Sequence, residues 1–295
     1  MKNPKVSIII VNYNGKRTFK KSLDSIRRSD FPKDEVEIIV VDNNSTDGSL
    51  AILRKYPGVI LIKNKDNRGF AEGNNIGIKK SKGEFIVLLN NDIIIKKDWI
   101  KRGIATMENN RFIGVLGGKI YYGGTKKIWF GGAKILPGLF VLHNYLNDKE
   151  GLSDYIAFSA VILRKSVLKR VGLFDEDFFL YVEDTDLCTR IKNGGYQIFY
   201  NPKMVSWHLI SEKRASAHEE YFEQRNRSYH FIKHFKYPKL GGIILDFFLF
   251  FPLFWLNRII RNPKKLKFLR ETVKARKDSL KMIFQNVYKI KIKDS

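Results

Sequence analysis

Val36–Asp42, with the sequence VEIIVVD, is an almost continuous apolar run that ends in a carboxylate. A second run, Phe85–Leu89 (FIVLL), leads in the same way into Asn90-Asn91-Asp92. Short runs rich in valine and isoleucine and bounded by turn residues predict strands of a parallel sheet covered on both faces. Ligands of such sheets bind outside the carboxyl ends of the strands. The sequence therefore predicts a cleft where two acidic strand ends meet.

Strands and helices alternate through the first third of the chain. Around the two runs, the sequence predicts a strand over 6–11, a helix over 16–29 and a short strand over 59–63. Alternation with short connections is typical of right-handed βαβ units. We therefore expect an α/β fold with a mostly parallel central sheet and helices on both faces.

The middle third of the chain has a different pattern. Segments 114–122 and 128–136 are short and interrupted by glycine, which predicts antiparallel edge strands. A further strand is expected over 155–163, and a helix over Glu183–Asn193 that ends at a glycine pair. The 295 residues suffice for one large α/β domain and an appended segment.

The net charge is strongly positive and uneven along the chain. The 54 lysines and arginines exceed the 30 acidic residues by 24, and residues 236–295 alone carry a net charge of +11. A field of this sign attracts polyanions, among them nucleic acid, anionic lipid head groups and phosphorylated substrates. Solvent-exposed lysines would also produce the excess in the first 235 residues.

The C-terminal segment combines an apolar, aromatic stretch with a basic one. Residues 243–256 are apolar apart from Asp246 and Pro252, and these 14 residues fall short of the about 20 that span a bilayer. A basic run follows, consisting of Arg258, Arg261, Lys264, Lys265, Lys267 and Arg270. This pairing favours a helix lying in an anionic membrane interface over one packed on the first domain or on a second copy of the chain.

Polar residues follow the first two predicted strands. Asn12-Tyr13-Asn14-Gly15 follows the first, and Asp42-Asn43-Asn44-Ser45 follows the second. The sequence leaves two interpretations of Asp42 open: a turn acid, or an acceptor of hydrogen bonds from a base or ribose, with the asparagines of 12–14 as the other wall. Neither segment is a GxGxxG motif or a P-loop, so dinucleotide and ATP sites lack their phosphate cradle.

Segment 67–77 (NRGFAEGNNIG) carries glycines at a spacing of four. On a helix this spacing allows close approach of a ligand or of a neighbouring backbone, and tight packing on the sheet explains it equally well. Arg68, just ahead of the helix, is placed to meet a phosphate together with the free N–H groups of the helix start.

Asp92 follows a fully apolar strand and is therefore anchored on rigid structure. A single carboxylate, with the remaining positions taken by substrate phosphates and water, is a common protein contribution to Mg²⁺ or Mn²⁺. His208, which follows Met204-Val205-Ser206-Trp207, is a second candidate ligand, although a single histidine in such a place is more often structural.

Acidic residues are dense between 174 and 186. In the helix expected from Glu183, Asp184 lies three positions before Leu187, which places it on the inward face. Asp186 lies four positions before Arg190 and is expected to form an outward ion pair. A carboxylate on the buried side of a helix start can have a tuned pKa, which makes Asp184 the candidate general base.

Taken together, these segments resemble the inverting, GT-A-fold glycosyltransferases of family 2, especially the rhamnosyltransferase-like branch. The resemblance extends from Val6 to about 207–211 and rests on blocks in the family's order. The blocks are VSIIIVNYNG, VDNNSTDGS, NRGFAEGNNIGI, LLNNDI, VGLFDEDFFLYVEDTDLCTRIKNGGYQIFYNP and VSWH. Each block alone is a weak signal, and their order and separation make the resemblance specific.

The resemblance implies a role for each candidate residue. It makes Asp184 the catalytic base with Glu183 as a supporting acid, and it places Mg²⁺ or Mn²⁺ on Asp92 with His208 as an additional contact. With the polar strand ends and the segment before the helix, the expected donor-binding residues are Asn12, Asn14, Asp42, Asn44, Arg68, Asn74, Asn90 and Asn91, and Lys213 or Arg214 would add positive charge at the phosphates.

The chain departs from the family pattern at two places. Asparagine stands at 90 and 91 in the DxD-type motif that ends in Asp92, which leaves the identity of the metal open. Phe158-Ser159-Ala160 lacks the glycine of the family, so the floor of the acceptor side is expected to differ.

The resemblance also implies the domain organisation and the reaction. We expect a Rossmann-like GT-A domain over 1–235, with a nucleotide-sugar half over about 1–112 and an acceptor half over about 113–235, and a helical extension over 236–295. The expected reaction is metal-dependent transfer of a hexose or deoxyhexose, rhamnose in the named branch, from a nucleoside-diphosphate sugar. The expected acceptor is a hydroxyl of a glycan or lipid-linked glycan in cell-surface polysaccharide synthesis.

The expected partners and location follow from composition and from the tail. The single cysteine, Cys188, and the lack of a signal-peptide pattern before the first strand predict a cytoplasmic protein. The tail predicts peripheral attachment to the anionic inner face of the cell membrane, with a homodimer through the C-terminal helices as the alternative. Nucleic acid is not an expected partner.

Three other functions are weighed against this one. A sugar-phosphate nucleotidyltransferase would need a glycine-rich phosphate loop after the first strand, where this chain has Asn12-Tyr13-Asn14. A nucleic-acid-binding protein would explain the charge and not the acidic stretch at 175–186. A catalytically inactive carbohydrate-binding homologue is compatible with Asn90 and Asn91, and sugar-nucleotide hydrolysis would exclude it.

Overall fold

The computed structural model describes residues 3–136, 140–144, 146–210, 216–234, 241, 245, 249, 251–261 and 263–293. Two compact units can be distinguished. The first comprises Met1–Lys134, Leu142–Phe179 and Asp184–Glu212, and the second comprises Ile135–Val141, Leu180–Glu183 and Lys213–Ser295. Helix α6 (Ala217–His234) belongs to the second unit, whereas the boundary expected from the sequence, at residue 235, assigns it to the catalytic domain.

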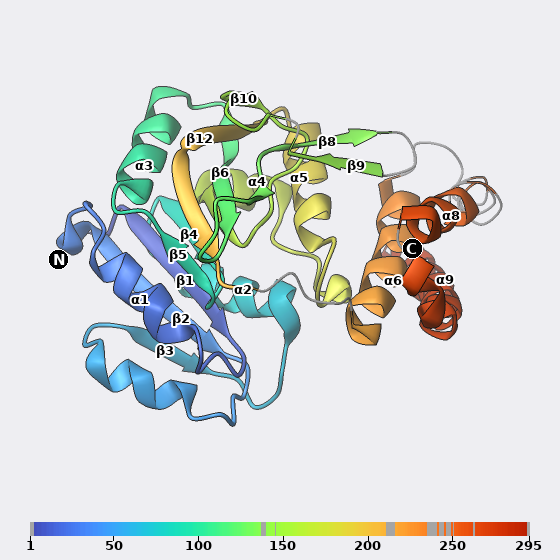
Figure 1. Cartoon of the computed structure of the whole chain (residues 1–295), viewed down its shortest axis with the longest axis horizontal. Helices are drawn as coiled ribbons and strands as arrows, with labels where there is room; N and C mark the ends of the chain where they lie inside the picture. Colours follow the sequence, from blue (N-terminus) through green and yellow to red (C-terminus); the bar gives the residue numbers. More distant parts are fainter. Residues whose placement is uncertain are drawn as a thin grey trace. The chain divides into compact units, whose positions relative to one another are not determined.

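The first unit alternates strands and helices up to residue 109, as the sequence predicts, and then becomes richer in strands (Figure 1). Its elements are β1 (Val6–Asn12), α1 (Phe19–Arg27), β2 (Val36–Asp42), β3 (Ile60–Lys63), α2 (Gly69–Lys80), β4 (Phe85–Leu89), β5 (Ile93–Ile95), α3 (Trp99–Asn109), β6 (Ile113–Tyr122), β7 (Ile128–Phe130), β10 (Gly151–Leu152), β11 (Ala160–Arg164), α4 (Lys165–Val171), α5 (Glu183–Asn193) and β12 (Gln197–His208). The short strands β8 (Ala133–Leu136) and β9 (Phe140–His143) pair separately.

The central sheet has the strand order β10-β12-β6-β11-β4-β1-β2-β3, with β5 on β12 and β7 on β6. β1 runs parallel to both β2 and β4, so the carboxyl ends of the strands that precede Asn12, Asp42 and Asn90 lie at one edge of the sheet. β11 is antiparallel to its two neighbours, whereas β12 is parallel to β6. The sheet is therefore parallel in its first half and mixed in its second.

The prediction that 114–122 forms an edge strand is wrong, because β6 lies inside the sheet between β12 and β11. Its glycines serve close packing instead. A Cβ at Gly117 would lie 2.2 Å from Cγ2 of Ile156, and one at Gly118 would lie 2.0 Å from the carbonyl oxygen of Met204. The strand predicted over 155–163 is shorter than expected, since β11 begins at Ala160.

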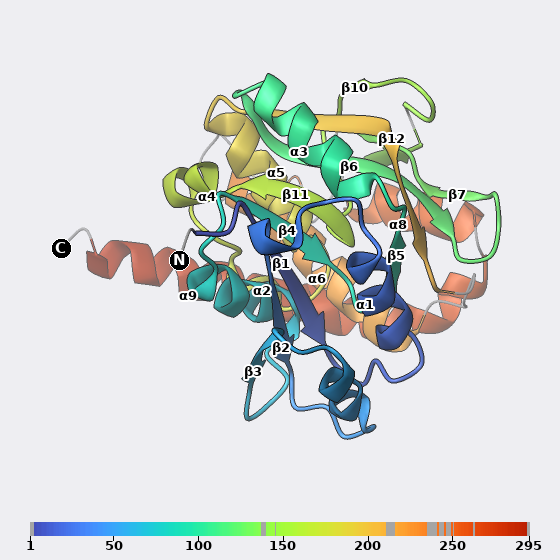
Figure 2. The ribbon, with the colours of Figure 1, turned by 90° about the vertical axis from the view of Figure 1, so that its left-hand side faces the viewer.

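Helices cover both faces of the sheet. α1 and α3 lie on one face, and α2, α4 and α5 lie on the other (Figure 2). α2 approaches β1 through its glycines, because a Cβ at Gly73 would lie 2.9 Å from Val11 and one at Gly77 would lie 2.4 Å from Ile9. The glycine spacing of 67–77 thus serves tight packing of the helix on the sheet.

Replacing Gly77 by alanine is expected to lower the free energy of unfolding by about 1–2 kcal/mol. The added methyl group would overlap Ile9, which is fully buried, and overpacking of this kind outweighs the modest helix-propensity gain of alanine. Urea unfolding measures the change, with Lys80→Ala at the exposed end of the same helix as the control. A Gly77→Ala protein as stable as the parent would contradict the packing argument.

The second unit is helical. α6 packs on α9 (Leu269–Lys293), and α8 (Phe251–Arg261) is followed by the 3₁₀ turn Pro263–Phe268. Tyr221 Oη donates a 2.7 Å hydrogen bond to Asp278, and the Arg276 guanidinium donates to the Ser228 hydroxyl, so polar contacts join the two long helices. Within the described ranges, no helix combines the length and hydrophobicity that crossing a bilayer requires.

Candidate active site

Asn12 and Asp42 are adjacent at the ends of β1 and β2 and share a buried hydrogen-bond network. The Asn12 amide donates to Asp42 Oδ1 at 2.8 Å and to the hydroxyl of Ser49 at 2.9 Å. Ser45 donates its hydroxyl to Asp42 Oδ1 at 2.6 Å and its backbone N–H to Oδ2 at 3.0 Å. Asp42 is only 2 % exposed, so the carboxylate orders the turn after β2.

Asn91 extends this network towards Asp92. Its amide donates a 2.9 Å hydrogen bond to Oδ1 of Asn12. Gly15 makes this bond possible, because a Cβ there would lie 2.3 Å from Nδ2 of Asn91 and 2.5 Å from Oδ1 of Asn12. Asn91, which occupies the middle position of Asn90-Asn91-Asp92, therefore links the turn after β4 through Asn12 to the turns after β1 and β2.

Asn14 and Asn44 both adopt left-handed backbone conformations, with φ of 51° and 62°. Asparagine tolerates this region better than most residues. Asn14 accepts a hydrogen bond from the Thr46 N–H at 2.9 Å, which joins the turn after β1 to the turn after β2. Asn44 is exposed beside them.

Asn43 is a residue that the sequence analysis did not single out. Its amide donates to Asn67 Oδ1 at 3.1 Å and to the carbonyl of Gly69 at 2.9 Å, and thereby fixes the loop that precedes α2. Arg68 lies in that loop at the N-terminus of α2, as predicted, and its exposed guanidinium pairs with Asp66 at 2.6 Å. Its position directly after β2 is the sequence signal that could have identified Asn43.

Two of the predicted donor-binding residues, Asn74 and Asn90, form hydrogen bonds to backbone carbonyl groups. Asn74 donates to the Phe70 carbonyl of its own helix at 2.9 Å. The Asn90 N–H donates to the carbonyl of Ser159 at 2.9 Å, which ties the end of β4 to the residue before β11. Lys213 and Arg214 lie outside the described residues.

Asp92 and His208 are brought together by the antiparallel pairing of β5 with β12. His208 is the partner of Ile93 in that ladder, and the Leu209 N–H donates to the carbonyl of Asp92 at 2.8 Å. Oδ1 of Asp92 lies 3.1 Å from Nε2 of His208, and the two side chains are 22 % and 8 % exposed. Residues 116 positions apart in the chain therefore present an oxygen and a nitrogen to the same point.

The donor set at Asp92 and His208 fits a divalent cation. Oδ1 of Asp92 is buried, and no described residue forms a hydrogen bond with it. Adjacent ligands of an octahedral ion at roughly 2.1 Å are about 3 Å apart, which matches the observed separation of the carboxylate oxygen and the imidazole nitrogen. Carboxylate and imidazole ligands suit Mn²⁺ and its neighbours in the first transition row.

Asp184 lies in the first turn of α5, and its carboxylate is held at both oxygens. Tyr155 Oη donates to Oδ2 at 2.8 Å, and the Thr185 N–H donates to Oδ1 at 2.7 Å. Burial raises the pKa of the Asp184 carboxyl above its ordinary value, and the hydrogen bonds from Tyr155, Thr185 and the Phe158 N–H offset part of that rise. A fixed carboxylate with a raised pKa is suited to accept a proton.

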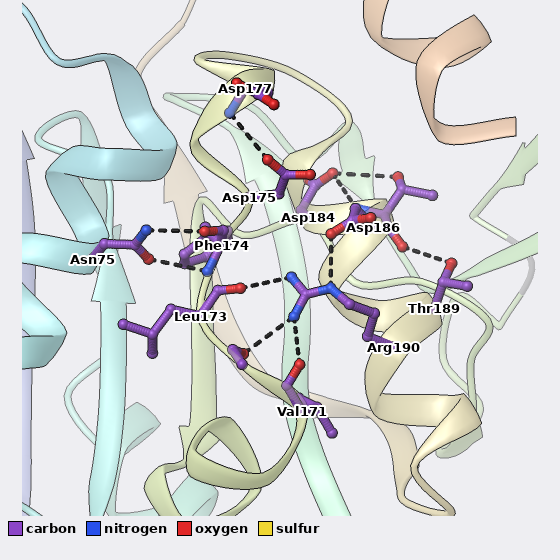
Figure 3. A network of polar contacts seen from close by, with 12 residues as sticks. Asn75, Val171, Leu173, Phe174, Asp175, Asp177, Asp184, Asp186, Thr189 and Arg190 are labelled. Atoms are coloured by element: carbon purple, nitrogen blue, oxygen red, sulfur yellow. Dashed lines mark hydrogen bonds and ion pairs between the residues drawn. The ribbon is translucent and has the colours of Figure 1, made fainter. Parts of the chain in front are cut away.

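The prediction that Asp186 points outward is wrong, although its ion pair with Arg190 is confirmed. Asp186 is fully buried, and its Oδ2 lies 2.9 Å from Nε of Arg190. The same guanidinium donates to the carbonyls of Val171 and Leu173 at 2.8 and 2.7 Å (Figure 3). Asp186 therefore anchors an arginine that fixes the loop before the acidic segment.

Asn75 fixes the other side of that loop and was also not singled out. Its amide donates to the carbonyl of Phe174 at 2.9 Å and accepts from the Phe174 N–H at 3.0 Å (Figure 3). This two-way bond joins α2 to the residue before Asp175. Asp186 and Asn75 thus both order the segment that leads to α5.

Comparisons with known proteins identify the family of the chain. Residues 7–171 match the protein-family model described as glycosyl transferase family 2. Glycosyltransferase AglE of Haloferax volcanii is 30 % identical over 211 residues, which cover 70 % of this chain and 67 % of that protein. Rhamnosyltransferase WbbL of Escherichia coli K12 is 27 % identical over 259 residues, which cover 75 % of this chain and 96 % of that protein.

A solved structure shares the fold. Mannosyltransferase PcManGT from Pyrobaculum calidifontis, in complex with GDP-Man and Mn²⁺, superimposes with a TM-score of 0.63 at 17 % identity. The match covers 95 % of this chain and 88 % of that one.

Proposed function

Because the chain belongs to glycosyl transferase family 2, we propose that it transfers a sugar, with inversion, from a nucleoside-diphosphate sugar to a hydroxyl of a glycan or lipid-linked glycan. The observation that carries this proposal is the pairing of Asp92 with His208 beside the Asn91–Asn12–Asp42 network. This arrangement places a pair of residues that fits a divalent cation at the edge of the sheet where a nucleotide would bind. The similarity to WbbL makes rhamnose the first sugar to test.

The donor would bind along the turns after β1 and β2. Asn14 and Asn44 would form the exposed polar wall for the nucleoside. Asn12 and Asp42, which are 0 % and 2 % exposed, would hold those two turns in place, and Asn91 ties them to Asp92. Arg68 at the start of α2 would exchange its exposed pairing with Asp66 for a phosphate, since exposed ion pairs contribute little. The remaining proposed donor contacts are Asn74 and Asn90.

Asp92 and His208 would hold Mg²⁺ or Mn²⁺, which when bound offsets the negative charge that develops on the departing nucleoside diphosphate. Asp184 accepts the proton of the acceptor hydroxyl as that oxygen attacks the anomeric carbon from the side opposite the leaving group. A single displacement of this kind inverts the anomeric centre. Glu183 is the supporting acid, and its side chain is buried.

Turnover of a panel of nucleotide sugars tests the proposed function. Release of nucleoside diphosphate from one member, faster with an acceptor glycan than without it, is the expected result. A panel that combines rhamnose, mannose and N-acetylglucosamine with different nucleoside diphosphates determines the specificity for the sugar and for the nucleotide independently. Binding of every member without turnover would instead favour the inactive carbohydrate-binding homologue.

The second unit is proposed to lie on an anionic membrane surface, where a lipid-linked acceptor would be found. In α8, Leu253, Leu256 and Ile260 share one face and are 49 %, 54 % and 69 % exposed. Leu266, Leu269 and Val273 repeat the same spacing at 54 %, 47 % and 49 %. The exposed cations Lys267, Arg270, Lys274 and Lys277 accompany them, and apolar insertion combined with basic residues is typical of interfacial helices.

Replacing Leu253, Leu256 and Ile260 by glutamine is expected to weaken binding to vesicles that contain an anionic phospholipid by about 100-fold. Each of these half-exposed side chains would contribute roughly 1 kcal/mol on insertion. Vesicle co-sedimentation measures the change, and the control is a Phe112→Gln/Leu152→Gln protein, whose exposed apolar residues belong to the first unit.

The same variant, with its oligomeric state measured beside its vesicle binding, distinguishes membrane attachment from contact with a second copy of the chain. If the parent protein is a dimer that ignores vesicles, and the glutamine variant is a monomer, the apolar face is a subunit interface. If both proteins bind vesicles equally, the face is not the attachment surface.

A further inference from the structure

Tyr155 forms a direct contact with the proposed base and has no role in the resemblance or in the function above. It lies between β10 and β11, where its backbone forms a bridge with Ala133 and its carbonyl accepts a 2.7 Å hydrogen bond from the Ser153 hydroxyl. Its own hydroxyl donates to Asp184 Oδ2 at 2.8 Å. Both the backbone and the hydroxyl of Tyr155 are therefore fixed.

The ring of Tyr155 belongs to a series of aromatic contacts that are edge-to-face except between Trp129 and Phe130, which are tilted by 50° with their centroids 6.5 Å apart. Its centroid lies 5.7 Å from that of Phe130 at an interplanar angle of 89°. Trp129, adjacent to Phe130 in β7, packs on the His208 imidazole at 4.6 Å and 88°. Edge-to-face contact at such distances is a preferred and stabilising arrangement of aromatic rings. The series connects the proposed metal ligand to the residue that holds the proposed base.

The Asp184 carboxylate would rotate more freely without Tyr155. Thr185 holds only Oδ1, through its N–H at 2.7 Å and its hydroxyl at 3.3 Å. The hydroxyl of Tyr155 is the side-chain donor at Oδ2, and a hydrogen bond to a charged acceptor is stronger than one between neutral groups. Tyr155 therefore contributes to the orientation of the carboxylate together with Thr185 and the Phe158 N–H.

We propose that Tyr155 is a positioning residue for the transfer reaction, which orients the Asp184 carboxylate and keeps it ionised as the proton acceptor. The proposal rests on the assignment of Asp184 as the base. A hydroxyl that donates to the carboxylate stabilises the charged form against burial, and loss of the hydroxyl leaves only Thr185 and the Phe158 N–H to offset that burial.

Other groups face Asp184 and would remain in a variant without the hydroxyl. The Thr185 and Phe158 N–H groups favour the ionised carboxylate. Glu183 and Asp186 are acidic neighbours on α5, and Asp186 is neutralised by Arg190. The thiol of Cys188 has a pKa that is raised by burial, and the charge of Asp184 contributes to that rise. Since these groups are unchanged, a shift in the variant reports on Tyr155.

The test compares Tyr155→Phe with Tyr200→Phe. Phenylalanine at 155 keeps the ring contacts and removes the hydroxyl. Tyr200 packs on the same Phe130 ring at 6.5 Å and donates its hydroxyl to the Asn147 carbonyl at 2.7 Å, away from Asp184, so it is a matched control. The rate of transfer is measured against pH for the full chain, with the donor KM determined at each pH.

Tyr155→Phe is expected to lower kcat about 10- to 100-fold with little change in the donor KM, because the lost hydrogen bond is one to a charged group. The acid limb of its pH profile is expected to move about one unit to higher pH. Asp184 must be ionised to accept a proton. Without the hydrogen bond from Tyr155, the pKa of Asp184 rises further, so activity is lost at a higher pH as the solution is acidified. Tyr200→Phe is expected to leave the limb in place.

An acid limb and a kcat that match those of Tyr200→Phe would overturn the positioning role. Normal turnover in Asp184→Asn would instead overturn the base assignment, and the positioning role with it, so the two failures are distinct. If Tyr155→Phe does not fold, fluorotyrosine at 155 provides the second test. Its more acidic hydroxyl is a stronger donor, and the acid limb should then move to lower pH; a limb that stays in place rejects the proposal.

Discussion

Asp184→Asn is expected to lower kcat for transfer by about 100- to 10,000-fold while the affinity for the donor stays close to that of the parent. The amide keeps the shape of the side chain and cannot accept the proton, and general base catalysis is typically worth this factor. The change is expected in kcat and not in donor affinity, because Asp184 accepts the proton only as the acceptor oxygen attacks. Initial rates at saturating donor, together with calorimetric donor binding, separate the two quantities.

Two further variants make the assignment of the base specific. Glu183→Gln is expected to have a milder effect, since Glu183 is proposed only as a supporting acid. Asp177→Asn, at an exposed acid in the same segment, is expected to match the parent. If Glu183→Gln were inactive while Asp184→Asn turned over normally, the base would be Glu183.

Asp92→Ala is expected to reduce transfer at least about 100-fold and to remove the effect of a chelator on nucleoside-diphosphate binding. The carboxylate is the anionic ligand of the proposed site, and charge stabilisation by a metal is worth several kcal/mol in the transition state. In the parent protein, calorimetry should show weaker diphosphate binding after chelation and recovery on adding Mn²⁺ or Mg²⁺. His208→Ala should show a smaller loss of the same kind.

The control for Asp92 is Asp98→Ala. The two aspartates have the same side-chain exposure of 22 %, and Asp98 pairs with Arg102 at 2.6 Å. This variant should keep both the rate and the response to chelator. Equal diphosphate affinity in the parent, the chelated parent and Asp92→Ala would reject the metal site.

Much of the proposed donor side was predictable because it depends on local patterns that repeat along the chain. Apolar runs that end in polar residues predicted β1, β2 and β4. The parallel pairing of β1 with β2 then places Asn12 opposite Asp42. The carboxyl ends of parallel strands meet at one edge whatever the helices between them do. Asp92 was predictable for the same reason, since it follows β4.

The second half of the sheet and the helix that carries Asp184 were less predictable, because their residues meet through long-range pairing. The local pattern of glycines in β6 predicts an edge strand, yet β6 is internal. Glycine also allows neighbouring residues to pack closely on a strand, and here Ile156 and Met204 do so. Asp186 has the spacing of a surface ion pair, and only the packing of α5 shows that the pair is buried. Local spacing does not specify which side of a helix is covered.

The sequence by itself determined the fold class, the family and the order of the polar strand ends, because hydrophobic periodicity and motif order are properties of short segments. Only the tertiary structure decided that Asp92 Oδ1 and His208 Nε2 lie 3.1 Å apart, and that Tyr155 holds Asp184. Each of these contacts joins residues about 30 or more positions apart, and their side chains are fixed by a strand ladder or a turn formed elsewhere. Contacts of this kind depend on the packing of the whole unit, which no short segment encodes.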